Sequence, residues 1–390
     1  MGRKQAVKPG WLEWERSQPE KPDGLKVEII TDFEELLGME EEWNRFANQT
    51  DADSPFTSHE WVTSWWQCFG RGKDLHIVIA REGNRIKGIA PLMSSRECRY
   101  GLPVQRLGSL YNGQVQRDEF IVDDRYKSSF CKVLWKHLMN HGDSWDLLEL
   151  CQFDYRSATL QELEKRATGT GVVCHYWTQG HSPYLPLTGA WEGYISGLSA
   201  NRRSQIRRKL RRLAERGEVE LKKITSEDEI ASALEDGFRI EGMAWKEVNG
   251  TAILSDEQVY RFYVELAERM AARGSLGLYF LQVGERKIAF QYCLESKNRI
   301  YLLKPGYNPE FFRYSPSTLL FWLILKQAFE DGVTEYDFLG DRDDWKMTWT
   351  NKTRTRVWFF LLSTSFRARV LRLVKFWLIP KVKSISGLAD

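Results

Sequence analysis

The chain has 390 residues, of which 42% are hydrophobic, and it contains 16 Trp, 15 Tyr and 20 Phe. Because this composition can bury a sizeable core, it excludes a disordered or fibrous protein, and the length suggests about two domains. Lys and Arg total 56 against 53 acidic residues, so the net charge of +3 does not by itself indicate a nucleic-acid-binding protein.

The six cysteines and six histidines show no spacing that is typical of a metal site. No CxxC pair and no HExxH pattern occurs, so we expect no metal. The N-terminal stretch lacks the apolar segment of a secretory signal, which predicts a cytoplasmic protein with reduced cysteines. No uninterrupted apolar run approaches the ~20 residues that a membrane-spanning helix needs.

The first half of the chain alternates strand and helix patterns. Residues 1–24 are polar and punctuated by proline, and we expect a flexible arm. Apolar periodicity then predicts a strand at 27–30, helices at 32–48 and from Ser58 to about 70, and a hairpin at 75–80 and 86–92. Farther along, it predicts a helix at 127–141, a strand at 147–150, a helix at 155–170 and a strand at 172–176. Residues 98–122 are glycine-rich and show no clear element. The aromatic face of the helix after Ser58, with Trp61 and Trp65, is more typical of a core than of a cofactor site.

A helix followed by a hairpin occurs twice. The second hairpin is predicted at 276–283 and 288–294, about 200 residues after the first, and each hairpin follows a long helix that ends in glycine. This repeat indicates a duplicated domain.

The densest charge cluster lies in a helix that opens near Ser199. It contains Arg202, Arg203, Arg207, Arg208, Lys209, Arg211, Arg212 and Arg216 above an apolar stripe at 198, 206, 210 and 213. Two interpretations remain open. The cluster is either an ordinary solvated helix face or a surface that attracts an anionic substrate such as a nucleotide-linked sugar, a lipid phosphate or tRNA.

Residues 366–380 form a basic amphipathic pattern that is too short and too charged to span a membrane. The segment either docks on the core or lies on an anionic lipid surface. The second alternative would make the protein peripheral at the inner face of the membrane.

The stretch 299–346 has strand, loop, helix and strand signals in the order that builds a reaction site. Residues 300–303 read as a strand that Pro305 and Gly306 end, a helix follows from about Ser317 to Asp331, and a second strand ends at Gly340. This order predicts a crossover unit with the helix N-terminus near the carboxyl edge of the first strand.

That helix N-terminus is a natural phosphate site, because its N–H groups and dipole favour an anion. Arg313 lies just upstream and adds a positive charge. The second strand delivers Asp337 and Asp341 to the same edge, and Lys346 follows one turn later. The alternative is that both aspartates cap or pair with nearby arginines and that the serines are plain helix caps, with no chemical role for any of them.

Several segments together resemble a known family. They are PFTSHEWVTSWWQCFG, GIAPL, NRRSQIRRKLRRLAERG, GYNPEFFRYSPSTLL and DFLGDRDDWKMTW. In this order and spacing the chain, over roughly residues 27–362, resembles the GNAT-related acyltransferases of the CelD-like (cellulose biosynthesis) type, which are similar to the FemX-like transferases with tandem GNAT domains. The resemblance implies a mixed-sheet α/β fold with two GNAT-like domains at 25–185 and 186–362, followed by the basic helix and tail at 363–390.

The resemblance also implies an acyl-CoA donor, most simply acetyl-CoA, in the second domain. In such proteins the loop before the helix at 317 holds the pyrophosphate, and the strands on either side of that helix splay to admit the pantetheine arm. The donor would then contact Leu303, Arg313, Tyr314, Ser315, Ser317 and Thr318. Ser317 stands where the family pattern has glycine, which makes the closest backbone approach of phosphate harder.

Acyl transfer to an amine needs a base and donors for the tetrahedral oxyanion. We assign Asp337 as the base, with Asp341 as the second choice, and Lys346 or a backbone N–H of the first strand as the oxyanion donor. Tyr307 is the candidate acid for the leaving thiolate. The candidate substrate-binding residues are Tyr111, Asn112, Asp118, Glu119, Arg203, Arg207, Trp245 and Trp345.

The leading hypothesis is therefore an N-acyltransferase that acts on an amino sugar, an amino acid or a precursor of the cell envelope or of a polysaccharide. One alternative is a FemX-like transferase that uses aminoacyl-tRNA, with the arginine-rich helix contacting RNA. The other is an inactive pair of GNAT domains that serves as a scaffold in polysaccharide synthesis.

Overall fold

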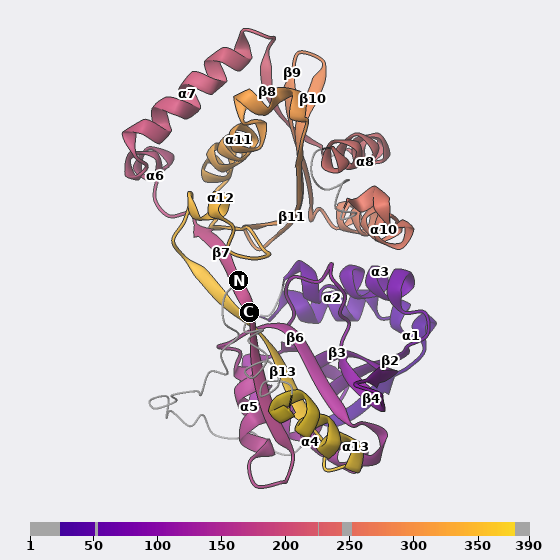
Figure 1. Cartoon of the computed structure of the whole chain (residues 1–390). Coiled ribbons are helices and arrows are strands. Elements are labelled where there is room, and N and C mark those ends of the chain that lie inside the picture. Colours follow the sequence, from indigo (N-terminus) through magenta and orange to yellow (C-terminus); the bar gives the residue numbers. More distant parts are fainter. Residues whose placement is uncertain (1–23, 51–53, 225, 244–251, 379–390) are drawn as a thin grey trace. The chain divides into compact units, whose positions relative to one another are not determined.

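The computed structural model describes residues 24–50, 54–224, 226–243 and 252–378 (Figure 1). The chain forms two compact units. The first runs to His181 and resumes at Arg354, and the second comprises Ser182–Thr353. Strand β7 (Val173–Pro186) leads from the first unit into the second, and β13 (Thr353–Leu362) leads back. The domain limits expected from the sequence, 25–185 and 186–362, stay predictions.

The first unit contains a mixed sheet. Its strands follow the order β1 (Lys26–Ile30), β2 (Asp74–Glu82), β3 (Arg85–Arg99), β4 (Leu102–Ser109), β6 (Leu147–Asp154), β13 and the first part of β7, with the short β5 (Ile121–Val122) beside β3. Every neighbouring pair whose register is defined in this sheet is antiparallel except β4 and β6, which run parallel. The predicted hairpin is confirmed as β2 and β3, and the glycine-rich stretch contains β4.

Helices cover both faces of this sheet. They are α1 (Phe33–Leu37), α2 (Glu40–Asn48), α3 (His59–Phe69), α4 (Lys127–Asn140), α5 (Ala158–Ala167) and α13 (Phe366–Arg372). Helices α4 and α5 pack in one core cluster with Leu148, Phe359 and Leu361, whereas α13 packs on Leu147, Phe360 and Leu362, which alternate with them along the strands. Because successive strand residues point to opposite faces, α13 lies on the other side of the sheet.

Trp61 and Trp65 of α3 are core residues, as the sequence predicts. Ser58 accepts a hydrogen bond from the Trp61 N–H and so caps the helix, and Trp61 and Trp65 are buried. The single helix predicted at 32–48 is wrong, because the chain breaks into α1 and α2 at Gly38, a residue of low helix propensity.

The second unit repeats the arrangement of the first. Its strands follow the order β7, β12 (Glu335–Asp337), β11 (Arg299–Tyr307), β10 (Arg286–Ser296), β9 (Leu276–Val283) and β8 (Val219–Ile224). The pair β9 and β10 is the second predicted hairpin, and β11 and β12 are parallel, as β4 and β6 are in the first unit. The predicted duplication is therefore visible in the order and direction of the strands.

The helices of the second unit lie on two sides of its sheet (Figure 1). One side carries α6 (Trp191–Gly197), α7 (Ala200–Ala214) and α11 (Pro316–Glu330), and the other carries α8 (Glu227–Gly242) and α10 (Glu257–Ala272), while α12 (Asp344–Met347) follows β12. Leu281 and Cys293 pack toward α11. The ring of Phe290 lies against Gly237 of α8, which leaves no room for a side chain at that glycine.

Two boundaries in the crossover unit differ from the prediction. Strand β11 continues through Pro305 to Tyr307 instead of ending near 303, and β12 ends at Asp337 because Leu339 and Gly340 adopt positive φ angles of 51° and 58°. Helix α11 begins at Pro316 and ends before Gly332, as expected.

The basic C-terminal segment packs on the first unit over its described part. After α13 a π-helical stretch, Leu373–Leu378, places the Lys375 ammonium 3.8 Å from the ring centre of Phe360 and 4.4 Å from that of Trp177. Lys375 is buried, and burial lowers its pKa to about 8. No helix in the described part of the chain is long and apolar enough to cross a bilayer. Contact of this segment with lipid stays a prediction.

The first unit is expected to lose stability in acid because of His76. Its Nε2 lies 3.2 Å from Nε2 of His137, and burial, together with His137 and His141, lowers the pKa of His76 to about 4. An unfolded histidine titrates near ~6.5, so between these values the unfolded state binds a proton that the folded state does not. The free energy of unfolding therefore falls as the pH falls through this window, by on the order of 3 kcal/mol for this one group.

Urea denaturation of the wild type and of His76→Gln between pH 7 and pH 4 measures this contribution. The variant should show the shallower dependence of the free energy of unfolding on pH. Equal dependences would contradict the prediction.

Candidate functional site

Strands β11 and β12 pair over a short distance and then part. The parallel register joins Arg299 to Glu335, Ile300 to Tyr336 and Tyr301 to Asp337, and β11 then continues to Tyr307 without β12. The backbone of β11 beyond Tyr301 is therefore not bonded to β12 on that side. A gap of this kind exposes strand N–H and C=O groups to whatever occupies it.

A bulge in β11 lies at the start of this gap. On the β10 side Cys293 pairs with Leu302 and Tyr292 with Lys304, so Leu303 is the extra residue. A bulge bends a strand and re-aims its groups, and bulges are frequent next to active sites. Pro305 is tolerated farther along because β12 offers no partner there.

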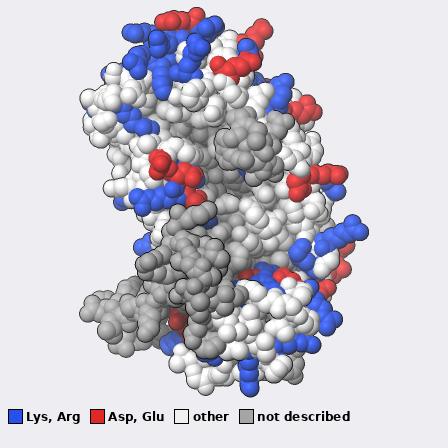
Figure 2. Space-filling view, viewed as in Figure 1, with Lys and Arg blue, Asp and Glu red and all other residues white. Residues whose placement is uncertain are grey.

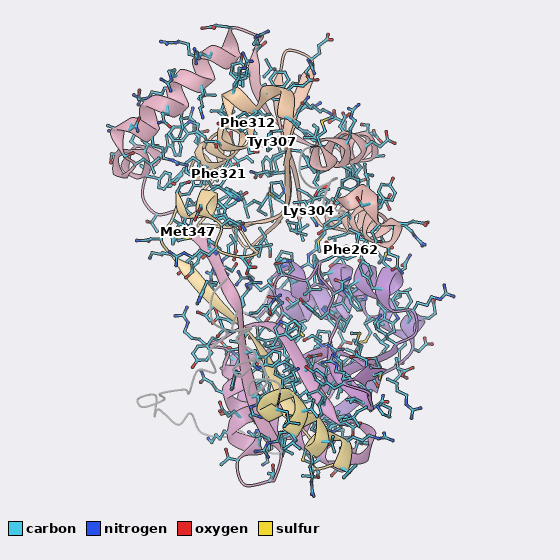
Figure 3. The ribbon with its side chains drawn as sticks, in the orientation of Figure 1. Phe262, Lys304, Tyr307, Phe312, Phe321 and Met347 are labelled. Carbon is cyan, nitrogen blue, oxygen red and sulfur yellow. The ribbon has the colours of Figure 1, made fainter. Side chains whose placement is uncertain are left out.

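A cavity of about 430 Å3 opens at the gap (Figure 3 labels two of its residues, Tyr307 of β11 and Phe321 of α11). It is lined by Arg202, Gln205, Ile206 and Lys209 of α7; Glu241 and Met243 at the end of α8; Gln291 of β10; Pro305, Gly306 and Tyr307 of β11; Ser317, Thr318 and Phe321 of α11; and Trp345, Thr348 and Trp349 in and after α12. Helices from both sides of the sheet contribute, so the cavity connects the two sides through the gap.

The start of α11 forms one wall. Ser315 takes a left-handed conformation (φ 52°, ψ 60°), and its carbonyl accepts the N–H groups of Thr318 and Leu319. Pro316 has no N–H, and within the described chain the Ser317 N–H has no hydrogen-bond partner. This free donor and the Ser317 and Thr318 hydroxyls suit an anion at the positive end of the helix dipole.

Lys209 adds a cation to the same wall. Its Nζ donates a hydrogen bond to the Ser315 hydroxyl. Burial lowers the pKa of Lys209, and the nearby Arg208 and Arg202 lower it further. An anion bound here would relieve that repulsion, so the wall is electrostatically matched to phosphate.

Arg202 and two aromatic residues form a second wall. The Arg202 guanidinium lies 4.0 Å from the ring centre of Trp349, and that ring is 4.7 Å from Phe321 in an edge-on contact. The Tyr194 hydroxyl donates to the Trp349 carbonyl and helps to hold the loop after α12. Planar or aliphatic parts of a ligand would pack here.

Glu241 at the end of α8 and Gln291 of β10 also line the cavity. Glu241 is 1% exposed, and its Oε2 accepts the Ile253 N–H at 3.0 Å. The Glu241 backbone lies so close to β11 that a methyl group on Gly306 would meet Glu241 Cα at 2.5 Å. Gln291 is also buried, and its Oε1 accepts the Tyr336 hydroxyl at 2.7 Å.

The residues assigned to catalysis from the sequence lie in two places. Tyr307 lines the cavity. Asp337 is 1% exposed, its Oδ1 accepts the Leu339 N–H at 2.9 Å, and it is not among the lining residues. Lys346 is buried, and its Nζ bonds the carbonyls of Leu339 and Asp341 and pairs with Asp343, so it holds the turn after β12. The assigned roles of all four, Asp341 included, stay predictions.

The residues assigned to the donor gather around the start of α11. Ser317 and Thr318 line the cavity, Ser315 contacts Lys209, the Tyr314 hydroxyl accepts from Arg216 Nε, and Leu303 is the bulged residue. Arg313 is exposed at the end of the preceding turn. Their binding roles stay predictions.

The residues assigned to the acceptor are dispersed. Trp345 lines the cavity, Arg203 bonds the carbonyls of Ile195 and Ser196, and Arg207 is exposed on α7. Trp245 lies outside the described residues, and Tyr111, Asn112, Asp118 and Glu119 belong to the first unit. Their roles also stay predictions.

In the first unit the corresponding gap is filled by protein. Strands β4 and β6 pair as far as Gly108 and Glu149. Beyond them the Ser109 hydroxyl accepts the Cys151 N–H at 3.1 Å, and the Asp118 N–H donates to the Gln152 carbonyl. Burial raises the pKa of Asp118 to about 8 and also raises that of Glu119. Asp118, one of the residues that the sequence assigned to an acceptor pocket, thus helps to close the gap of its own unit through its backbone.

Comparison with known proteins matches the part of the chain that forms the cavity to a family of transferases. Residues 200–347 match the family model described as "Acetyltransferase (GNAT) domain". The fold is GNAT-like. The matched GNAT region contains all the cavity-lining residues except Thr348 and Trp349. No curated protein matches the chain.

Three solved structures share the fold over most of the chain. FemX has 11% identity and a TM-score of 0.60, covering 90% of this chain and 99% of its own. A protein of unknown function from Bacteroides thetaiotaomicron has 10% identity and a TM-score of 0.54, with 84% and 97% covered. A C-terminal domain assigned to a lysylphosphatidylglycerol synthetase of Agrobacterium fabrum has 11% identity and a TM-score of 0.51, with 87% and 96% covered. The CelD-like type stays a resemblance.

Gly306 is expected to be required for the packing of the cavity. In Gly306→Ala the new methyl group meets the Glu241 backbone at 2.5 Å and 2.8 Å, so α8 or β11 must shift. We expect a loss of about 1–3 kcal/mol in the free energy of unfolding, as for other overpacked sites. Chemical denaturation measures it.

The matched control is Gly193→Ala in α6, where the added methyl group meets nothing within 4 Å. That control should leave stability unchanged or raise it, because alanine favours helices. Equal stability of the two variants would contradict the packing argument.

Proposed function

We propose that the protein is an N-acyltransferase that moves an acyl group from acyl-CoA to an amine. The observation that carries this proposal is the cavity in the gap between β11 and β12, which is lined from both sides of the sheet and has the start of α11 as one wall. A thioester that enters along α11 can meet an acceptor that enters from the α8 side. The matched GNAT domain supports the same reaction class.

The residues present fit the phosphates of CoA. The Ser317 N–H, the Ser317 and Thr318 hydroxyls and the Lys209 ammonium converge on one wall, and a phosphate would accept hydrogen bonds from each. The bound donor supplies the activated acyl group. Arg202 and Trp349 would pack against its less charged parts.

Backbone N–H groups of β11 and the Tyr307 hydroxyl also suit the chemistry of acyl transfer. The N–H groups of β11 beyond Tyr301 that β12 does not engage are donors for the oxyanion that forms when an amine attacks the thioester carbonyl. Tyr307 lines the cavity and is the candidate to protonate the leaving thiolate. We propose acetyl-CoA as the donor, and as acceptor an amino sugar, an amino acid or a precursor of the cell envelope or of a polysaccharide.

Acetyl-CoA binding tests the proposal. At a hundredfold excess over its dissociation constant, a true donor stabilises the protein by about 2.7 kcal/mol, which a thermal shift assay detects. In Lys209→Gln the loss of a charge-assisted hydrogen bond should weaken binding about tenfold in isothermal titration calorimetry.

The control for this variant is Lys326→Gln, an exposed lysine near the other end of α11 that pairs with Glu330. Its affinity for acetyl-CoA should equal that of the wild type. A wild-type protein that does not bind acetyl-CoA would refute the proposal.

A second candidate is a transferase that uses aminoacyl-tRNA, and the surface of α7 favours it. Arg207, Arg208, Arg211 and Arg212 are exposed, and none of them pairs with a carboxylate in the described part of the chain. Figure 2 shows Lys and Arg side chains gathered over α7 at the top of the view. Like charges at helical spacing repel one another, so a polyphosphate that binds there gains from their neutralisation.

Salt dependence tests this candidate. If Arg211 contacts a phosphate of tRNA, Arg211→Gln should make the negative slope of log K against log salt shallower by about 0.7–1. Arg261→Gln, an exposed arginine of α10, should leave the slope unchanged. Absence of tRNA binding at low salt, or equal slopes for both variants, would exclude this candidate.

A further inference from the structure

We propose that the outward side of helix α13 and of the π-helical stretch after it is a docking surface for an anionic lipid bilayer. The helix would lie along the membrane surface and hold the protein there. This surface belongs to the first unit, and the proposal does not rest on the acyltransferase activity proposed above. The sequence left two alternatives for the segment, docking on the core or contact with lipid, and the two sides of the helix allow both.

One side of the helix is fixed on the sheet of the first unit (Figure 1). Ala368 and Leu371 are fully buried in the cluster that also contains Phe360 of β13, and Lys375 is buried one turn later. The Ser365 hydroxyl caps the start of the helix by accepting the Ala368 N–H. The fold therefore determines which side of the helix faces away from the sheet.

The outward side exposes apolar side chains. Phe366 is 79% exposed, Leu373 is 50% exposed, and Val370 between them is half-buried. Steps of four and then three residues place all three on one side of a helix, opposite the buried Ala368 and Leu371. An exposed apolar stripe of this kind gains free energy when a partner covers it.

Cations flank this stripe on both sides. Arg367, Arg369 and Arg372 are exposed, and at about 100° per residue the first lies on one flank and the other two on the opposite flank. Within the described residues neither Arg369 nor Arg372 pairs with a carboxylate, and Arg367 approaches Asp146 only at 4.0 Å. The sequence contains no Asp or Glu from 366 to 389. The charge of this segment is therefore complementary to an anionic partner.

Two carboxylates on this side of the sheet do not offset these cations at the surface. Asp146 is buried, and it accepts hydrogen bonds from the Ser365 hydroxyl and the Gln105 N–H. Glu149 is also buried and pairs with Arg106, which is itself buried. Their charges are engaged inside the protein, so the positive charge of the helix faces outward.

The combination of an apolar stripe with flanking arginines distinguishes a bilayer from other anionic partners. In an interfacial helix the apolar side chains enter the boundary of the acyl chains while the arginines reach the lipid phosphates. An RNA would engage the arginines and leave Phe366 and Leu373 in water, so it would gain nothing from the apolar stripe. The position of the cations on both flanks favours a partner that is negative on both sides of an apolar layer, as a membrane surface is.

Vesicle sedimentation with the full-length protein tests the proposal. The vesicles contain either phosphatidylcholine alone or phosphatidylcholine and phosphatidylglycerol in equal parts. One variant combines Phe366→Ser with Leu373→Ser, and the other combines Arg369→Gln with Arg372→Gln. All four side chains are exposed, so the variants should fold, and thermal melting checks this.

Each variant has a matched control in the second unit. Phe312→Ser with Leu254→Ser removes a phenylalanine and a leucine that are 72% and 56% exposed. Arg211→Gln with Arg212→Gln removes two exposed cations from α7. The controls change the same residue types as the variants and leave the α13 surface intact.

The wild type should bind the anionic vesicles and not the phosphatidylcholine vesicles, and its binding should weaken as the salt concentration rises. Loss of Phe366 and Leu373 should weaken binding to the anionic vesicles at least about tenfold, because less apolar surface is buried. Loss of Arg369 and Arg372 should also weaken it at least about tenfold. Both controls should bind as the wild type does.

A second measurement uses the wild type alone and so does not depend on the folding of a variant. Phenylglyoxal modifies accessible arginine side chains, and mass spectrometry reports the modification of each one. Anionic vesicles should protect Arg369 and Arg372 and should leave Arg211 and Arg212 as reactive as before.

Several results would overturn the proposal. They are a wild type that does not bind the anionic vesicles, equal binding to both kinds of vesicle, and unchanged modification of Arg369 and Arg372 when vesicles are present. Binding that depends on these arginines but not on Phe366 and Leu373 would indicate an anionic polymer such as RNA instead. An equal loss in the α7 control would show a general attraction of charge. None of these results bears on acetyl-CoA binding, so failure here is distinct from failure of the proposed function.

Discussion

A parallel strand pair that is bonded for three residue pairs and then parts is the constraint on which the site depends. Parallel strands normally remain paired, because unpaired backbone groups are costly when buried. Here the Leu303 bulge bends β11, Pro305 removes one N–H that β12 would otherwise have to satisfy, and Gly306 lets α8 approach the strand. The gap therefore depends on local sequence features that would weaken an ordinary strand.

The charges around the gap are arranged in a consistent way. Lys209, Arg202 and the start of α11 make the α11 side positive. A ligand that carries phosphates would be attracted to this side before any specific contact forms.

The two units show how similar strand orders lead to different outcomes. In both units a hairpin is followed by a strand, a helix and a second strand parallel to the first. In the first unit the side chain of Ser109 and the backbone of Asp118 satisfy the groups that the parting strands expose. In the second unit such groups face a cavity. In both units the backbone groups exposed by the parting strands need hydrogen-bond partners. In the first unit other protein groups supply them, and in the second unit the groups face the cavity.

Much of this architecture was accessible from the sequence, because it depends on periodic patterns and caps. The two hairpins, the Ser58 cap, the start of α11 and the arginine-rich helix after Ser199 are all confirmed. The extent of β11 was not predictable, because Pro305 and Gly306 are breakers in an isolated strand and are accommodated only by the missing β12 partner and the close helix. Glu241 and Gln291 gave no local signal, because their place at the cavity is set by long-range packing.

Amide hydrogen exchange of the wild-type protein with and without CoA tests the central claim most directly. A ligand seated in the gap should protect the amides of β11 from Leu302 onward, except Pro305, together with those of Ser317 and Thr318, and should leave the first unit's strands β4 and β6 unchanged. Protection that appears elsewhere while these amides exchange as before would contradict the account.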